Sequence, residues 1–181
     1  MLFDLTTILI ISALFGITMK IADLFNEHKM KSWFPGSSIL FGILYGGLGV
    51  VLILSDTTLA NVILAMIVAF ILRYRIDYLN HGIAASIILI SFLYKSVFDI
   101  NVFLPLFLAF ALFGLIEDYV SEKLNKEIKI PKRLPFYSPI VFVYAIITGN
   151  WVIFLSLFLY ELFYIITDIY GVKVVKKQES H

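Results

Sequence analysis

Long apolar runs separated by short polar stretches cover most of this chain. Seven runs can be marked, at residues 5–21, 34–54, 59–72, 78–98, 102–116, 134–148 and 151–170. An apolar helix of about 20 residues crosses the hydrocarbon core of a bilayer. The third, fifth and sixth runs are shorter, and we expect them to span if their polar ends are buried or long side chains snorkel. The pattern predicts an all-α, polytopic integral membrane helix bundle of about seven transmembrane helices, with six as the fallback.

Composition supports the membrane class and a single domain. Hydrophobic residues make up 61% of the 181 positions, whereas soluble domains contain about 45–50%. We expect one transmembrane domain over residues 1–172 and a short basic cytoplasmic tail over residues 173–181. The first run lacks a basic leader and a cleavage site, so we expect it to stay as a membrane helix. The absence of cysteine excludes disulfides, thiolate metal sites and cysteine nucleophiles.

The placement of basic residues predicts the orientation. In a seven-span arrangement every lysine and arginine except Lys95 falls on one side, which is 13 of the 14. Cytoplasmic loops carry the excess of these residues. We therefore expect the N-terminus outside, the C-terminus inside and a multi-pass protein of the plasma membrane. Soluble catalysis and sequence-specific nucleic-acid binding are excluded, because the basic residues are interleaved with acids next to membrane spans.

Acidic residues within and beside the apolar runs are the main functional signal. Glu161 lies near the middle of the last run, where a carboxylate costs roughly 2.5–3.5 kcal/mol on insertion scales. It shares a helical face with Tyr164 and Asp168, so this face should point into the bundle. Each predicted cytoplasmic helix end also carries an aspartate; these are Asp23, Asp77, Asp118 and Asp168. If the helices close into a bundle, we expect a polar, acid-rich cavity facing the cytoplasm.

The residues around this cavity suit a lipid phosphate or diphosphate held with Mg²⁺. Carboxylates are the ligands that Mg²⁺ prefers, and the predicted metal ligands are Asp23, Glu27, Asp118 and Asp168. Arginine binds phosphate through its planar fork, and the predicted phosphate-binding residues are Arg73, Arg75 and Arg133. The predicted catalytic residues are Asp77, His81 and Glu161. The first hypothesis is therefore a membrane-embedded enzyme with a lipid substrate.

Two other function classes stay open. A small proton- or cation-coupled transporter or channel would use Glu161, with a path reaching the outer face. A structural or assembly subunit would pair its acids with lysine and arginine inside the bundle. The Gly42-x-x-x-Gly46 motif serves close helix packing. It acts either within one chain or as the face of a homo-oligomer.

The segment that follows the fifth run contains Asp118, Tyr119, Asn125, Pro131, Arg133, Leu134 and Pro135. These positions resemble the first aspartate-rich loop of the UbiA family of prenyltransferases. The resemblance implies a prenyl diphosphate held through Mg²⁺ on aspartates. The third aspartate at the family spacing is absent, and Glu122 lies one position away from it. The chain is also too short for the family's second aspartate-rich loop, so we assign no family.

Overall fold

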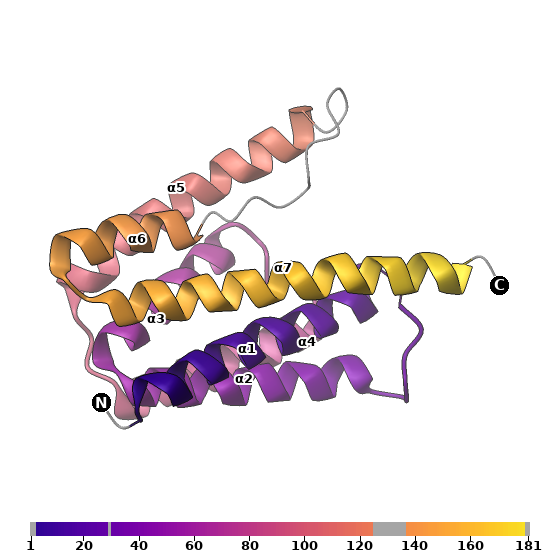
Figure 1. The fold of residues 1–181 in the computed structure, drawn as a ribbon, viewed down its shortest axis with the longest axis horizontal. Coiled ribbons are helices and arrows are strands. Elements are labelled where there is room, and N and C mark those ends of the chain that lie inside the picture. The colour runs from indigo at the N-terminus through magenta and orange to yellow at the C-terminus, as the bar shows by residue number, and fades with distance from the viewer. Residues whose placement is uncertain (1–2, 29, 125–136, 180–181) are drawn as a thin grey trace.

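The computed structural model describes residues 3–28, 30–124 and 137–179, and these ranges contain seven helices and no strand. The helices are α1 (Leu5–Asn26), α2 (Ser37–Ser55), α3 (Thr57–Leu72), α4 (Leu79–Lys95), α5 (Ile100–Leu124), α6 (Tyr137–Thr148) and α7 (Trp151–Glu179). The predicted all-α architecture is confirmed, with one helix in each apolar run (Figure 1).

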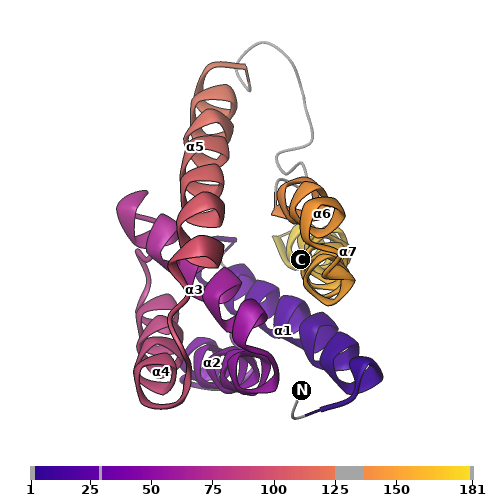
Figure 2. The ribbon, with the colours of Figure 1, turned by 90° about the vertical axis from the view of Figure 1, so that its left-hand side faces the viewer.

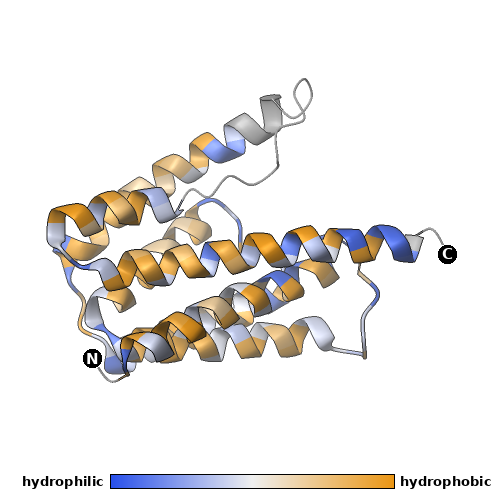
Figure 3. Ribbon diagram, in the orientation of Figure 1, coloured by the Kyte–Doolittle hydropathy of each residue, from blue (hydrophilic) through white to orange (hydrophobic). Residues whose placement is uncertain are grey.

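Four of the helices are long and apolar enough to cross a membrane. They cover Leu5–Asn26, Ser37–Ser55, Ile100–Tyr119 and Trp151–Gln178. The others are shorter, at 16 residues in α3, 17 in α4 and 12 in α6. A helix rises 1.5 Å per residue, so α6 is only about 18 Å long against a hydrocarbon core of about 30 Å. Apolar residues dominate the helices, and polar ones gather at helix ends and links (Figure 3).

Short links with defined caps join the helices. The side chain of Asp4 accepts a hydrogen bond from the backbone N–H of Thr7 and so caps the start of α1. Asp56 caps α3 in the same way and alone separates it from α2. Gly36 before α2 and Gly149 before α7 have φ angles of 85° and 73°, a region that favours glycine.

The core forms where α1, α2, α3 and α7 meet. α1 packs against both α7 and α2, α2 packs against α4, α3 packs against α5, and α6 packs against α7. Figure 2 shows α2 and α4 side by side, with α5 and the α6–α7 pair at different places around the bundle. Fully buried core side chains include Ile8, Leu59, Val62, Phe110 and Ile153.

Chain direction alternates, so the bundle has two different ends. At one end, which we call the polar end, odd-numbered helices finish and even-numbered helices begin. There Asn26 of α1 bonds Asn80 of α4, and Arg73 after α3 bonds Asp118 of α5. At the opposite end Asn61 fastens α3 to the link between α4 and α5. Its amide donates to the carbonyls of Thr57 and Val97 and accepts from the backbone N–H of Asp99.

The glycine motif packs α2 against α4 of the same chain. A Cβ atom at Gly42 would lie 2.9 Å from the backbone of Asn80, and one at Gly46 would lie 3.0 Å from the Cα of Ala84. Both positions therefore require the small residue within one molecule. A second copy of the chain would have to displace α4 to use this face.

The basic segment after residue 172 is largely helical. α7 continues to Glu179, so the segment expected as a tail forms, up to that residue, the last turns of α7. Val175 is buried there against Leu24, Phe25 and Met30. The end of α7 thus belongs to the packed domain and fixes the link between α1 and α2, where Lys31 N–H donates to the Gln178 side chain.

Candidate functional site

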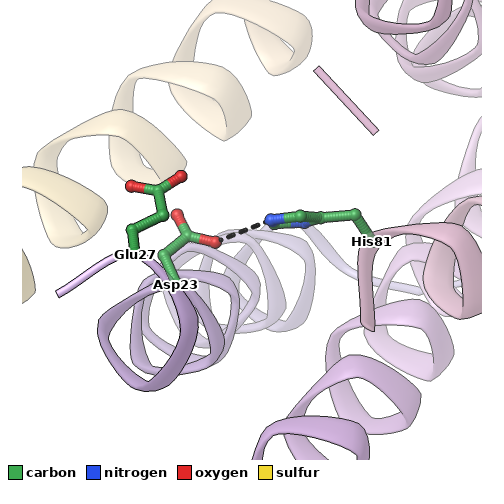
Figure 4. Close-up of side chains that lie close together, drawn as sticks. All are labelled: Asp23, Glu27 and His81. Atoms are coloured by element: carbon green, nitrogen blue, oxygen red, sulfur yellow. Dashed lines mark ion pairs between the residues drawn. The ribbon is translucent and has the colours of Figure 1, made fainter. Parts of the chain in front are cut away.

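Three of the predicted site residues meet at the polar end and form what we call the histidine cluster: Asp23, Glu27 and His81. Asp23 lies in the last turn of α1 and Glu27 is the C-cap residue that follows this helix, so their four-residue spacing puts both on one face. His81 approaches them from the start of α4 (Figure 4). One ligand atom from each of the three side chains lies within 4.8 Å of the others.

Neighbouring contacts fix the helices that carry this cluster. The Asn26 amide of α1 donates to Asn80 Oδ1 of α4 at 2.7 Å, directly beside the cluster. Ser38 at the start of α2 donates to Asn26 Oδ1 at 3.0 Å. The close approach of α2 and α4 at Gly42 brings Asn80, the residue before His81, against α2. The positions of α1 and α4 are thus set by part-buried polar contacts as well as by packing.

Asp23 and His81 are buried, and each has a tyrosine partner. Only 2% of the Asp23 surface is exposed. Its Oδ2 accepts a hydrogen bond from the Tyr164 hydroxyl of α7 at 2.5 Å, while Oδ1 lies 3.1 Å from His81 Nε2. The other ring nitrogen of His81, Nδ1, lies 2.8 Å from the Tyr45 hydroxyl of α2. Glu27 is exposed, so the cluster reaches the molecular surface at this residue.

Asp168, a predicted metal ligand, pairs instead with a buried lysine. Lys20 of α1 is fully buried, and its ammonium lies 2.7 Å from Asp168 Oδ1 on α7. The same ammonium lies 5.1 Å from the centre of the Tyr164 ring, a cation–π contact. His28 Nε2 also approaches Asp168 Oδ1, at 3.8 Å. Lys20 thus compensates the charge of Asp168 beside the histidine cluster.

A second group of charges, which we call the arginine cluster, consists of Arg73, Arg75, Glu117, Asp118 and Tyr137. Arg73 Nε and Nη2 each donate to Asp118 at 3.0 Å, one to each carboxylate oxygen. Its guanidinium also reaches Glu117 Oε2 at 3.5 Å and the Tyr137 hydroxyl at 3.3 Å. Arg75 pairs with Asp118 as well. This network ties the end of α3 to α5 and to the start of α6.

Arg73 is enclosed by the network. Its side chain is 3% exposed, and the guanidinium lies against Gly114 of α5, where a Cβ atom would collide with it. Burial by itself would lower the pKa of Arg73, but the hydrogen bonds and charge of Asp118 raise it above its usual value. Arg73 therefore stays charged and remains matched to Asp118.

Glu161 binds the start of α6. Its Oε1 accepts the backbone N–H of Tyr137 at 2.8 Å, and its Oε2 accepts the backbone N–H of Ser138 at 2.9 Å and bonds the Ser138 hydroxyl. These N–H groups have no partner inside their own helix, and the positive end of the helix dipole favours a carboxylate there. The central acid of the last apolar run thus holds α6 onto α7.

The predicted site residues therefore divide into several groups. Asp23, Glu27 and His81 come together, whereas Asp118, Asp168 and Glu161 bind other partners. Asp77 is exposed between α3 and α4, and Arg133 lies outside the described residues. Sequence reasoning missed Tyr45 and Asn26, although Tyr45 precedes Gly46 in the packing motif and Asn26 lies between Asp23 and Glu27.

The histidine cluster has the donor set of a divalent cation site. Two carboxylates and a neutral imidazole supply two negative charges and both oxygen and nitrogen ligands. The arginine cluster, in contrast, matches its carboxylates with guanidinium groups. No known protein family, curated protein or solved structure matches this chain.

Proposed function

We propose that this protein is a membrane-embedded enzyme that acts on a lipid phosphate or diphosphate at the polar end of the bundle, with a divalent cation. The observation that carries the proposal is the convergence of Asp23, Glu27 and His81, whose ligand atoms lie within 4.8 Å of one another. A cation held there neutralises phosphate charge and orients the phosphorus centre. The sequence predicted Mg²⁺ as this cation, because carboxylates are the ligands that Mg²⁺ prefers.

The surrounding residues support this role. Tyr164 orients the Asp23 carboxylate and Tyr45 orients the His81 ring, as groups behind metal ligands do. Glu27 is exposed, so it connects the buried pair of Asp23 and His81 with the molecular surface. Arg75, whose side chain is 55% exposed, offers guanidinium N–H groups at the same end. A membrane-resident substrate fits a chain in which four helices can cross a bilayer.

The proposed topology places the polar end in the cytoplasm, with the N-terminus outside, the C-terminus inside and the chain in the plasma membrane. The lysine and arginine distribution supports this orientation. Trp33, in the α1–α2 link at the polar end, is 61% exposed and packs edge-on against Phe25 and Phe41. Tryptophan favours the membrane–water interface, so Trp33 indicates the level of the lipid head groups. The seven helices then all contribute to the membrane bundle, and α6 crosses part of its thickness.

The geometry gives less support to a transporter that uses Glu161. Both oxygens of this carboxylate accept hydrogen bonds from the start of α6, and a mobile proton or cation would compete with those bonds. A structural or assembly subunit is the outcome that remains if no lipid phosphate is converted.

The proposal is tested by reconstituting the protein in liposomes that contain an isoprenyl diphosphate or a phosphatidic acid. Loss of the substrate and release of phosphate are measured with a divalent cation and with a chelator. We expect cation-dependent conversion by the wild type, and its loss in Asp23→Asn. Asp99→Asn, at the opposite end of the bundle, should keep the activity. Absence of conversion in the wild type with every cation and both lipids would overturn the proposal.

A further inference from the structure

Tyr45 offers His81 a hydrogen-bond arrangement that places the ring proton on Nδ1. The Tyr45 hydroxyl can donate its single proton to the backbone carbonyl of Asn80, at 3.3 Å. In that arrangement the Tyr45 oxygen accepts from His81 Nδ1, 2.8 Å away, which then carries the ring proton. This tautomer is assigned from the hydrogen-bond network. In the neutral ring it leaves Nε2 as a lone pair.

In this tautomer the Nε2 lone pair faces a carboxylate oxygen of Asp23. His81 Nε2 lies 3.1 Å from Asp23 Oδ1, and within the described part of the chain no other group donates a hydrogen bond to this oxygen. The other oxygen of Asp23 already accepts from Tyr164. Two buried acceptors at this distance repel each other unless a cation lies between them. With the ring proton on Nδ1 alone, the pair is therefore stabilised by a bound metal ion. With a proton on Nε2, His81 donates to Asp23 Oδ1 instead.

The spacing matches that of two ligands on one metal ion. Ligand atoms about 2.1 Å from a metal, at angles between octahedral and tetrahedral, lie about 3.0–3.4 Å from each other. The distance from Nε2 to Oδ1 falls within this interval. Glu27 adds a second carboxylate within reach. Tyr45 and Tyr164 occupy the remaining polar atoms of His81 and Asp23, which is the arrangement that groups behind metal ligands adopt.

We infer that the histidine cluster binds a first-row transition-metal cation of the Mn²⁺ or Zn²⁺ class in preference to Mg²⁺, with Nε2 of His81 as a ligand. This inference rests on the proposed function and specifies its cofactor. Imidazole nitrogen suits transition metals, whereas Mg²⁺ favours oxygen ligands and water. The affinity of a mixed nitrogen and oxygen site should rise from Mn²⁺ to Zn²⁺.

The test is equilibrium binding of Zn²⁺, Mn²⁺ and Mg²⁺ to the full chain, purified in detergent without a histidine tag. Wild type is compared with His81→Gln, Tyr45→Phe and the matched control His28→Gln. We expect one Zn²⁺ per chain, bound more tightly than Mn²⁺, and Mn²⁺ more tightly than Mg²⁺. Tyr45→Phe should weaken Zn²⁺ binding by about 10–100-fold, as loss of an outer partner does. His81→Gln should weaken it further, and His28→Gln should leave it unchanged.

A second readout separates ligation from loss of the fold. With Co²⁺ in the site, the visible absorption bands should change in His81→Gln and persist in His28→Gln, while thermal unfolding shows that each variant is folded. Equal affinity for Mg²⁺ and Zn²⁺ that His81→Gln does not alter would overturn the inference and leave the proposed function standing. Equal loss of Zn²⁺ binding in His28→Gln would also overturn it. If the wild type bound no cation at all, the inference and the proposed function would both fail.

Discussion

The histidine cluster and the arginine cluster occupy the same end of the bundle and are built on similar sequence. Each contains an aspartate near the end of an odd-numbered helix, Asp23 in α1 and Asp118 in α5, with a glutamate nearby. Asp118 meets Arg73, which donates to both of its oxygens. Asp23 meets His81, whose Nε2 lies 3.1 Å from one of its oxygens. The difference shows that the residue supplied by the neighbouring helix determines whether an aspartate at a helix end forms an ion pair or faces an imidazole.

The consequence of this difference is electrostatic. In the arginine cluster two guanidinium groups match the charges of two carboxylates, and the enclosed Arg73 holds α3, α5 and α6 together. In the histidine cluster the partner that α4 brings to Asp23 is an imidazole, and Tyr45 contacts its other ring nitrogen. We therefore propose a structural role for Arg73 and Asp118 of the arginine cluster and a ligand-binding role for the histidine cluster. The following substitutions test the contacts that distinguish these regions of the bundle.

The largest effect on stability is expected from Arg73→Met. Removing the enclosed Arg73 leaves the part-buried Asp118 and Glu117 with only the exposed Arg75, among the described residues, nearby to compensate them, which costs about 3 kcal/mol of unfolding free energy. Arg75→Met, at a side chain that is 55% exposed, should cost only about 0–1 kcal/mol. Chemical unfolding in detergent measures both. Similar losses in the two variants would contradict the enclosed position of Arg73.

Arg73 should make no contribution to the pH dependence of stability near neutrality. Its folded-state pKa is raised, so its stabilisation is complete below the unfolded pKa and is lost only as the pH rises through the folded value. The difference in unfolding free energy between wild type and Arg73→Met at about pH 7 should therefore persist at about pH 9. A difference that shrinks over this interval would mean that Arg73 loses its proton.

Glu161→Gln should cost less than Arg73→Met but still destabilise the bundle. The glutamine amide offers one acceptor where the carboxylate offers two, and its NH₂ group would face the backbone N–H groups of Tyr137 and Ser138. A buried donor left without a partner costs about 1–3 kcal/mol. Ser138→Ala, which removes only a hydroxyl, is the milder comparison. If Glu161→Gln were as stable as wild type, the carboxylate would be protonated and would not bind α6 as an anion.

Gly42→Ala should disturb the histidine cluster without touching its side chains. The added methyl meets the backbone of Asn80, and overpacking of this kind costs about 1–3 kcal/mol. Because His81 follows Asn80 on α4, cation binding should weaken as well. Gly47→Ala is the matched control, since a Cβ at Gly47 meets nothing within 4 Å. That control should be neutral or stabilising by about 0.5–1 kcal/mol. Equal cation binding in both variants would show that the approach of α2 to α4 does not set the position of His81.

Local sequence patterns predicted the elements and one face of the site. Continuous apolar runs placed seven helices, because a run of that length in this composition has few alternatives to a helix. The four-residue spacing of Asp23 and Glu27 put both carboxylates on one side of α1. The packing of Gly42 and Gly46 followed from their size, although which helix they would meet did not.

The long-range pairing of helices was not visible in the sequence. Asp118 and Asp168 were expected beside Asp23, but α3 packs on α5 and brings Arg73 to Asp118, while α7 packs on α1 and brings Lys20 to Asp168. The side chain of Glu161 was expected to point into the bundle, and it is buried there. What the sequence could not indicate is its partners, because these include backbone N–H groups of α6.

The most direct test of the assigned roles is cation-dependent thermal unfolding of wild type, Asp23→Asn and Asp118→Asn, followed in detergent with Mn²⁺ or Zn²⁺. A cation that binds only the folded state, present at 100 times its dissociation constant, adds about 2.7 kcal/mol of stability. We predict that the wild type gains this stabilisation, that Asp118→Asn starts less stable yet keeps the gain, and that Asp23→Asn loses the gain. A gain that survives in Asp23→Asn and disappears in Asp118→Asn would contradict the assignment of ligand binding to the histidine cluster.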